Sequence, residues 1–296
     1  MSPTEATAFA FLADYALARR LEAADTAVGV ESAEIHARID PASGAVAEHL
    51  AGGVAVFVGV NSPLTQALGV GMEGPVRGQD LDALEHFFIS RRAAVHVELC
   101  PLADPSVLRE LAQRSYRLVD FSNMMVRKIR IVEMAVPPGS SISVQFSGPE
   151  DSDVWARTIA MGFGEHEVQT AENLEVLRNI VARPATKCVI AWVDGRPAGG
   201  GALSIHDGVA AIYGASTVPA FRRLGVQSAV IRALMNHAVE SECDLAYTLT
   251  RPGSVSQRNL ERQGFRVAYT RSTLLQESPG ATARAWTPVA AHKDDQ

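Results

Sequence analysis

The sequence predicts a mixed α/β (α+β) protein built from two tandem copies of one unit, each a central, mostly antiparallel sheet flanked by helices. Three observations predict this. The chain has 296 residues, which suits two domains of ordinary size. Residues 94–120 and 243–269 align without gaps at a constant offset of 149 positions. The second half alternates strand, turn and helix signals along its length.

The internal repeat holds across a strand, a turn, a short helix and the start of another strand. Leu111 corresponds to Leu260, and Tyr116 corresponds to Phe265. The Pro-Pro-Gly-Ser run at 137–140 is typical of a boundary between domains. We therefore expect a first domain at residues 1–136 and a second at 141–277. Residues 278–296, rich in Pro, Gly, Ala and charge, are expected to form a loosely ordered tail.

Composition excludes several classes of protein. Apolar residues make up 47% of the chain, yet no uninterrupted apolar run approaches the ~20 residues of a membrane span. The N-terminus lacks the pattern of a secretory signal, so a cytoplasmic protein without membrane association is expected. A formal charge of −6 argues against nucleic-acid binding. Cys100, Cys188 and Cys243 lack metal-ligand spacing, and we expect buried thiols and no metal site.

The second half begins with two helical segments and three strands. Residues 153–161 and 174–182 show helical spacing. Strands are expected at 188–193, 198–206 and 209–217, because Asp-Gly pairs at 194–195 and 207–208 favour tight hairpin turns. Together the strands predict an antiparallel meander.

The pattern then changes to alternating helices and strands. Pro219 ends the third strand, a loop follows at 222–227, and apolar spacing from Val226 to His237 predicts a helix. A strand is expected at 244–249. Ser254 and Gln257 form a capping-box pattern at the start of the next helix, and Gly264 favours its end before a strand at 265–270. Residues 80–91 form the corresponding earlier helix of the first half.

This order of elements, together with one loop, resembles the GNAT superfamily of N-acetyltransferases over residues 144–273. The family signature is Pro-x-x-Arg/Gln-x-x-Gly-x-Gly/Ala after a strand and before a long helix. Here it stands as Pro219-Ala-Phe-Arg-Arg-Leu-Gly225-Val-Gln227. A helix N-terminus offers unpaired N–H groups and a favourable dipole to a pyrophosphate, and a glycine allows close approach of the backbone. The loop therefore favours binding of acetyl-coenzyme A as co-substrate.

The resemblance implies contacts with the cofactor from the end of the third strand, the loop, the first turn of the helix and the later helix. The expected cofactor-binding residues are Ala215, Ser216, Thr217, Val218, Arg222, Arg223, Leu224, Gly225, Val226, Gln227, Ser228, Ser256 and Asn259.

Two positions depart from the family pattern. Gln227 replaces the final Gly or Ala, and its side chain either turns away from the phosphates or contacts the cofactor. Leu260 stands where the family often has a tyrosine acid, four residues before Gly264. Catalytic candidates are Glu165 in the loop at 162–168, with His166 and Glu167 beside it, and Tyr213 and Ser216 on the strand that the resemblance places near the acetyl group. Water is the alternative proton carrier.

The predicted function is transfer of an acetyl group from acetyl-CoA to the amine of a small molecule or peptide, by a monomer or homodimer. Leu260 keeps open a non-catalytic acyl-CoA-binding module. Transfer of an aminoacyl group from charged tRNA is a further alternative, which the acidic charge disfavours. The first half lacks Arg-x-x-Gly, having Val76 opposite Gly225, and is not expected to bind acyl-CoA. Three roles are open for the first half: it shapes the acceptor pocket, it covers an exposed sheet edge, or it is a spacer without a direct chemical role.

Overall fold

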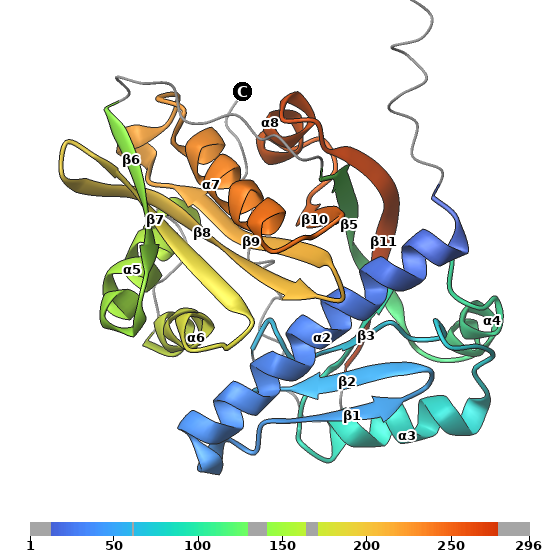
Figure 1. The fold of residues 1–296 in the computed structure, drawn as a ribbon. Helices are drawn as coiled ribbons and strands as arrows, with labels where there is room; N and C mark the ends of the chain where they lie inside the picture. Colours follow the sequence, from blue (N-terminus) through green and yellow to red (C-terminus); the bar gives the residue numbers. More distant parts are fainter. Residues whose placement is uncertain (1–12, 61, 130–140, 164–170, 278–296) are drawn as a thin grey trace, which may run out of the picture.

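The computed structural model describes residues 13–60, 62–129, 141–163 and 171–277, and their strands form one continuous sheet. The sheet has 11 strands in the order β1-β2-β3-β4-β11-β5-β10-β9-β8-β7-β6 (Figure 1). Helices cover both faces, and the long helix α2 crosses the region where the two halves meet (Figure 1). The predicted mixed α/β class with a mostly antiparallel sheet is confirmed.

The first half contains most of one repeat unit. Its elements are α2 (Tyr15–Ile39), η2 (Pro41–Ser43), β1 (Val46–Leu50), β2 (Gly53–Phe57), β3 (Gln66–Leu68), α3 (Gly78–Ile89), β4 (Val95–Leu99), α4 (Ser106–Ala112) and β5 (Arg117–Lys128). Helix α2 begins where the Asp14 carboxylate accepts a hydrogen bond from the Leu17 N–H at 2.8 Å. Apolar residues recur at helical spacing from Phe9 to Leu21, and the helix continues beyond them to Ile39; residues 1–12 lie outside the described chain.

The second half matches the expected order and adds an edge strand, β6. Its elements are β6 (Ile142–Ser147), η3 (Pro149–Asp151), α5 (Ser152–Phe163), α6 (Ala171–Val181), β7 (Thr186–Val193), β8 (Arg196–His206), β9 (Val209–Thr217), η4 (Pro219–Phe221), α7 (Val226–Glu240), β10 (Leu245–Thr250), α8 (Val255–Arg262) and β11 (Arg266–Gln276). The three-stranded meander appears as β7, β8 and β9.

The two halves exchange their last strands. β11 of the second half lies between β4 and β5, and β5 of the first half lies between β10 and β11. The exchange places Met125 of β5 in the second-half core, while Leu274 of β11 packs against the first-half core. These two residues are themselves 149 positions apart, so each repeat completes the core of the other.

The pairing of β5 with β11 follows an approximate two-fold axis. Arg271 pairs with Ser122, again 149 positions away, and the irregularities of register leave out Ala268 on one strand and Val119 on the other. Such matched bulges are built into both strands of a repeat. The tandem arrangement is therefore visible in the sheet itself.

A buried ionic cluster lies at this axis. Arg271 is 0% exposed, and it forms ion pairs with Glu22 (2.8 Å) and Asp25 (2.6 Å) of α2. The Tyr269 and Tyr247 hydroxyls donate hydrogen bonds to these carboxylates, to Glu22 at 2.7 Å and to Asp25 at 2.9 Å. Burial lowers the pKa of Arg271, but the two carboxylates outweigh it and hold that pKa well above its ordinary value. Helix α2 is thereby fixed to the junction of the halves.

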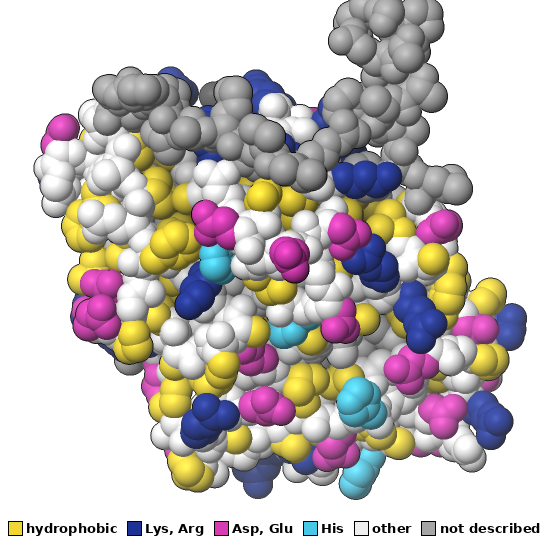
Figure 2. Space-filling view, in the orientation of Figure 1, with side chains coloured by type: hydrophobic (Ala, Val, Ile, Leu, Met, Phe, Trp, Pro, Cys, Tyr) yellow, Lys and Arg dark blue, Asp and Glu magenta, His cyan; other side chains and the backbone are white. Residues whose placement is uncertain are grey.

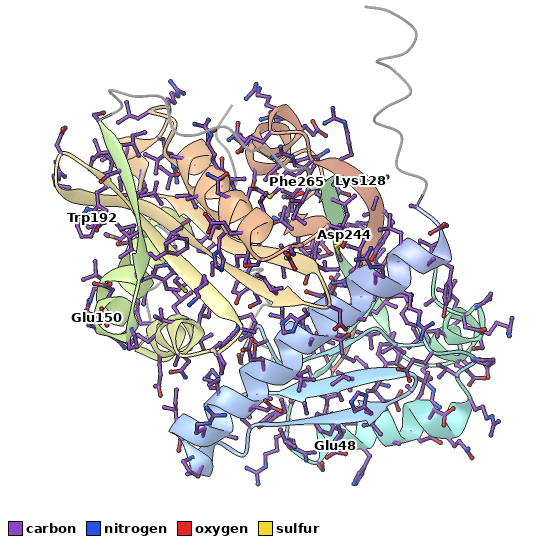
Figure 3. All side chains as sticks on the ribbon, viewed as in Figure 1. Glu48, Lys128, Glu150, Trp192, Asp244 and Phe265 are labelled. Atoms are coloured by element: carbon purple, nitrogen blue, oxygen red, sulfur yellow. The ribbon has the colours of Figure 1, made fainter. Side chains whose placement is uncertain are left out.

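Other contacts tie α2 to the second half. Arg20 forms an exposed ion pair at 2.6 Å with Asp244, which lies just before β10 and is labelled in Figure 3. The Glu31 carboxylate accepts the Ala185 N–H at 2.8 Å, just before β7. The domain division between residues 136 and 141 stays a prediction, because residues 130–140 lie outside the described chain, as does the tail at 278–296.

Candidate functional site

The sheet opens between β9 and β10. These parallel strands are paired at only three positions, from Val209–Leu245 to Ala211–Tyr247. Beyond that point β10 stays paired with β5 up to Thr250, while β9 continues along β8 to Thr217. Backbone groups on the facing sides of the two strand ends therefore have no ladder partner within the described pairings.

A bulge in β9 accounts for the opening. Gly200 pairs with Ser216 and Ala202 pairs with Tyr213, so Gly214 and Ala215 together oppose Gly201. Gly214 has a φ of 65°, a conformation that glycine adopts without strain. A bulge bends its strand, and this one turns the end of β9 away from β10.

The end of β9 presents its backbone in alternating directions. The Val218 N–H donates to the Ala198 carbonyl at 2.9 Å, so Val218 bonds toward β8. By the alternation of an antiparallel ladder, the Thr217 amide turns the other way, toward β10. Two buried hydroxyl oxygens lie at the ends of the diverging strands, Thr217 Oγ1 and Thr250 Oγ1, and neither has a hydrogen-bond partner among the described residues. Buried hydroxyls without partners are rare and mark places where a ligand or water supplies the bond.

The predicted loop follows directly. Arg222, Arg223, Leu224 and Gly225 are exposed, and Gly225 has a φ of 92° at the N-cap of α7. No side chain caps this helix end, so the N–H groups of its first turn receive no hydrogen bond from a capping side chain. A Cβ on Gly225 would meet only Ile142, 4.0 Å away, so the space beside it is open. The loop thus offers uncapped N–H groups and cationic side chains on one exposed surface.

Glycines in β8 let α7 pack close to that strand. A Cβ on Gly199 would lie 2.8 Å from Val226, and one on Gly201 would lie 2.9 Å from Val230. Both contacts are on α7, whose apolar face is buried in the core of the second half. The glycine run in this strand therefore holds the N-terminus of α7 against the bulged strand.

The unusual Gln227 faces the later helix. Its Oε1 accepts a hydrogen bond from Asn259 Nδ2 at 2.8 Å, and Asn259 Oδ1 accepts one from Arg262 at 3.0 Å. The glutamine in the place of Gly or Ala therefore links the first turn of α7 to α8. Ser228 and Ser256, both half-buried, lie in the first turns of the same two helices.

The catalytic candidates lie in different surroundings. Glu165, His166 and Glu167 are outside the described residues. The Ser216 hydroxyl is buried and donates to the Ile159 carbonyl of α5 at 3.1 Å. The Tyr213 hydroxyl lies 2.7 Å from Ser204 Oγ and 2.9 Å from Thr186 Oγ1, and burial raises the pKa of this phenol. The structure thus brings the loop, α7 and α8 together, while Tyr213 lies apart among protein hydroxyls.

The position of the missing acid is part of the core. Leu260 is 2% exposed and packs in the same cluster as Phe265 and Val230 (Figure 3 labels Phe265). Its side chain supplies no proton donor.

Sequence reasoning missed Thr250 and the bulge at Gly214. A glycine in the middle of a predicted strand is a known sign of a bulge. Thr250 lay one residue beyond the predicted end of its strand, and no local signal distinguishes it. The three cysteines are buried and unpaired, as interpreted, and burial raises the pKa of Cys100 and of Cys188 to about 12.

Residues 155–265 match the model of the acetyltransferase (GNAT) family. This region is a GNAT acetyltransferase domain. The match begins in α5 and ends at Phe265, so it includes the bulged strand, the loop and both helices of the site. A chain with such a domain is accordingly an acyltransferase. The comparison with curated proteins gave no match.

Solved structures share the fold over most of the chain. A GCN5-related N-acetyltransferase from Kribbella flavida has a TM-score of 0.61 at 17% identity, over 86% of this chain and 95% of that one. A tandem GNAT protein from the clavulanic acid biosynthesis pathway has a TM-score of 0.55 at 16% identity, over 75% and 78%. A GNAT-family protein from Novosphingobium aromaticivorans has a TM-score of 0.51 at 15% identity, over 82% and 96%. A protein described as a tandem GNAT is therefore among the solved structures that share this fold.

The described residues contain no group of three or more His, Cys, Asp or Glu side chains placed to hold a metal ion. None of their helices combines the length and apolar character that a membrane crossing needs.

Proposed function

We propose that this acyltransferase binds the pyrophosphate of acetyl-CoA at the first turn of α7 and transfers the acetyl group to the amine of a small molecule or peptide. The observation that carries the proposal is the uncapped N-terminus of α7 beside the opening between β9 and β10. An acyl-CoA has a pyrophosphate for the helix end and an extended arm with two amides for the opening.

The residues present fit such a donor. The N–H groups from Val226 to Ser228 favour an anion, and the open side of Gly225 admits it. Arg222 and Arg223 add positive charge beside it. The amide of Thr217, turned toward β10, suits pairing with an amide of the donor in the manner of an added strand. The buried hydroxyls of Thr217 and Thr250 supply further polar contacts.

The reaction itself requires little covalent chemistry from the protein. The acceptor nitrogen attacks the thioester carbonyl carbon, the carbon–sulfur bond breaks, and one proton passes from the amine to the sulfur. Backbone N–H groups at the end of β9 are suited to stabilise charge on the carbonyl oxygen. Because Leu260 has no proton to give, we propose that water carries the proton to the departing sulfur.

Calorimetry with acetyl-CoA tests the binding site. The Gly225→Trp variant is expected to lose measurable binding, because an indole fills the open side of the loop. Gly195→Trp is the matched control, since Gly195 also has a positive φ (71°) and no atom within 4 Å of an added Cβ, but lies in the turn between β7 and β8. Equal binding by both variants would show that the donor binds elsewhere.

Release of free thiol with a panel of amines tests turnover. We expect at least one amine to raise thiol release above the rate of hydrolysis in the wild-type protein. If acetyl-CoA binds and no small-molecule or peptide amine raises the rate, the proposed acceptor class is wrong, and a non-catalytic acyl-CoA-binding module becomes the better interpretation.

A further inference from the structure

A groove of about 640 Å³ runs along α2 on the face drawn in Figure 2, away from the donor site. Helix α2 contributes residues along its length, from Arg19 to Arg38. One wall comes from the first half, at Gly52, Gly53, Gly69, Met72 and Glu73, and the other comes from the second half, at Pro184, Ala185 and His206. The groove therefore has lining residues from both repeats.

The groove is distinct from the acyl-donor site. His206 pairs with Val209 at the start of β9, whereas the donor site lies around Thr217 at its end. Eight residues of strand separate these points by about 26 Å at 3.3 Å per residue. An occupant near His206 is therefore too far away to be the acceptor during transfer.

Glu31 is a deeply buried carboxylate left incompletely paired in this groove. Its side chain is 9% exposed, and one oxygen accepts the Ala185 N–H at 2.8 Å. The other oxygen, Oε2, is buried and has no hydrogen-bond partner among the described residues. Glu22 is buried more deeply, but Arg271 forms an ion pair with it. A buried carboxylate oxygen without a donor costs free energy unless a ligand or water supplies one.

His206 provides a second polar atom on the same wall. Its Nε2 is buried and also lacks a partner among the described residues. Burial lowers the pKa of His206, which leaves a neutral imidazole able to accept a hydrogen bond at neutral pH. A positively charged group with several N–H donors can donate to both Glu31 Oε2 and His206 Nε2. An alcohol has only one donor and no charge, and an anion has no donor to offer.

The other lining residues favour a cation with an alkyl chain. The carboxylates of Glu34 and Glu73 add negative charge, against Arg19 and Arg38. Ala23, Ala27 and Val30 of α2 give the groove an apolar floor that suits methylene groups. Acidic, basic and histidine side chains lie over the path of α2 in Figure 2, with apolar surface among them.

We propose that this groove is a second ligand site, which binds a small linear primary amine with its ammonium group between Glu31 and His206. The ammonium donates hydrogen bonds to Glu31 Oε2 and His206 Nε2, and its alkyl chain lies along the small side chains of α2. Bound there, the amine contacts α2 of the first half and the start of β7 of the second.

Calorimetry at pH 7.5 with linear monoamines and diamines of two to six carbons tests the site, with the corresponding alcohols and diols as neutral probes. At least one amine is expected to bind once per chain, and its alcohol is not. Glu31→Gln keeps an oxygen for the Ala185 N–H but removes the charge, so affinity is expected to fall at least about tenfold. His206→Ala is expected to weaken binding about threefold.

Glu175→Gln is the matched control, because it removes the same charge from an exposed position of α6 that does not line the groove. It is expected to change amine affinity less than about twofold, in line with the small energies of exposed charges. Acetyl-CoA binding is expected to be unchanged in all three variants, which separates this site from the donor site. Absence of binding by every amine, equal binding of a diol, or full affinity in Glu31→Gln would overturn the proposal.

Discussion

Helices α3 and α7 occupy corresponding places in the two repeats, but their first turns differ in charge. In α3 the Asp80 carboxylate accepts the Arg77 N–H at 2.8 Å, so a negative side chain already occupies the helix N-terminus. In α7 the N-cap is Gly225, and the third residue after the N-cap, which is Asp80 in α3, is Ser228. A carboxylate there both satisfies the backbone and repels a phosphate. The same scaffold therefore presents an open anion site in one half and a filled one in the other.

The two halves also differ in how this first turn, or the loop before it, is linked to the next helix of the repeat. In the first half, the loop before α3 is bonded to the start of α4, because Asp104 N–H donates to the Gly71 carbonyl at 3.0 Å and Val76 N–H donates to Ser106 Oγ at 2.7 Å. A Cβ on Gly71 would lie 2.2 Å from Val107, so α4 packs directly on this loop. In the second half, the corresponding link is between the side chains of Gln227 and Asn259. In the first half, polar bonds and close packing therefore fill the space that corresponds to the donor site.

Exchanging the two first turns gives the largest expected effect. Ser228→Asp places a carboxylate at the end of α7, and the affinity for acetyl-CoA is expected to fall about a hundredfold, because that charge opposes the pyrophosphate. Asp80→Ser makes the reverse change in α3 and is expected to leave affinity within about twofold. Calorimetry measures both. Unchanged binding by Ser228→Asp would show that the charge at the two helix ends does not decide which half binds the donor.

At the position where the family often has a tyrosine acid, the two halves are alike. Leu260 and Leu111 correspond, and they are 2% and 4% exposed. Leu260→Tyr is expected to lower the free energy of unfolding by about 1–3 kcal/mol, because a larger side chain overpacks the core. Thiol release is not expected to rise. Leu111→Tyr, which enlarges the same position in the first-half core, is the control for stability. A clear gain in rate for Leu260→Tyr alone would mean that proton transfer to sulfur limits turnover.

The local parts of the second half could be predicted from the sequence. β9 has the predicted bounds, and the loop before α7 follows it as the motif indicates, because Asp-Gly turns, Pro219 and Gly225 act within a few residues. The exchange of β5 and β11 could not be predicted, since pairing between strands about 150 residues apart leaves no local signal.

The burial of charge was equally beyond the sequence. Glu22 and Asp25 look like solvent-facing residues of α2 until Arg271, about 250 positions later, packs against them. The burial of Thr250 could not be predicted either, because what lies opposite the end of β10 depends on the bend in β9. Placement of the acetyl group relative to Tyr213 and Ser216 stays a prediction, as does the role of Glu165.

A smaller effect, on stability alone, is expected from the hydrogen bond that joins the loop before α3 to α4 in the first half. Ser106→Ala leaves the buried Val76 N–H without its acceptor, which should cost about 1–2 kcal/mol of unfolding free energy. Acetyl-CoA affinity is expected to stay the same, because this bond lies in the filled half. Denaturant unfolding measures the first quantity and calorimetry the second. Weaker acetyl-CoA binding in Ser106→Ala would indicate that the first half takes part in the donor site.

The smallest effect concerns the contact of α2 with the second half, where His36 Nε2 lies 3.4 Å from Asn179 Nδ2 of α6. Burial lowers the pKa of His36 below 6.5, and Arg183 lowers it further, while the Ser32 carbonyl, Glu175 and Asp40 act in the opposite direction. Because the folded state holds this imidazole neutral, its contribution to stability is complete above pH 6.5 and is lost as pH falls below it.

We therefore expect the melting temperature to fall by a few degrees between pH 7.5 and pH 5.5, and to fall less in His36→Asn. His96 and His206, whose pKa values burial also lowers, account for the part of the fall that remains in this variant. Since β5 and β11 each complete the core of the other half, acid is expected to lower one shared transition. Two separate transitions, seen by fluorescence and by circular dichroism, would show that strand exchange does not couple the repeats. The different first turns of α3 and α7 would then belong to independently stable units.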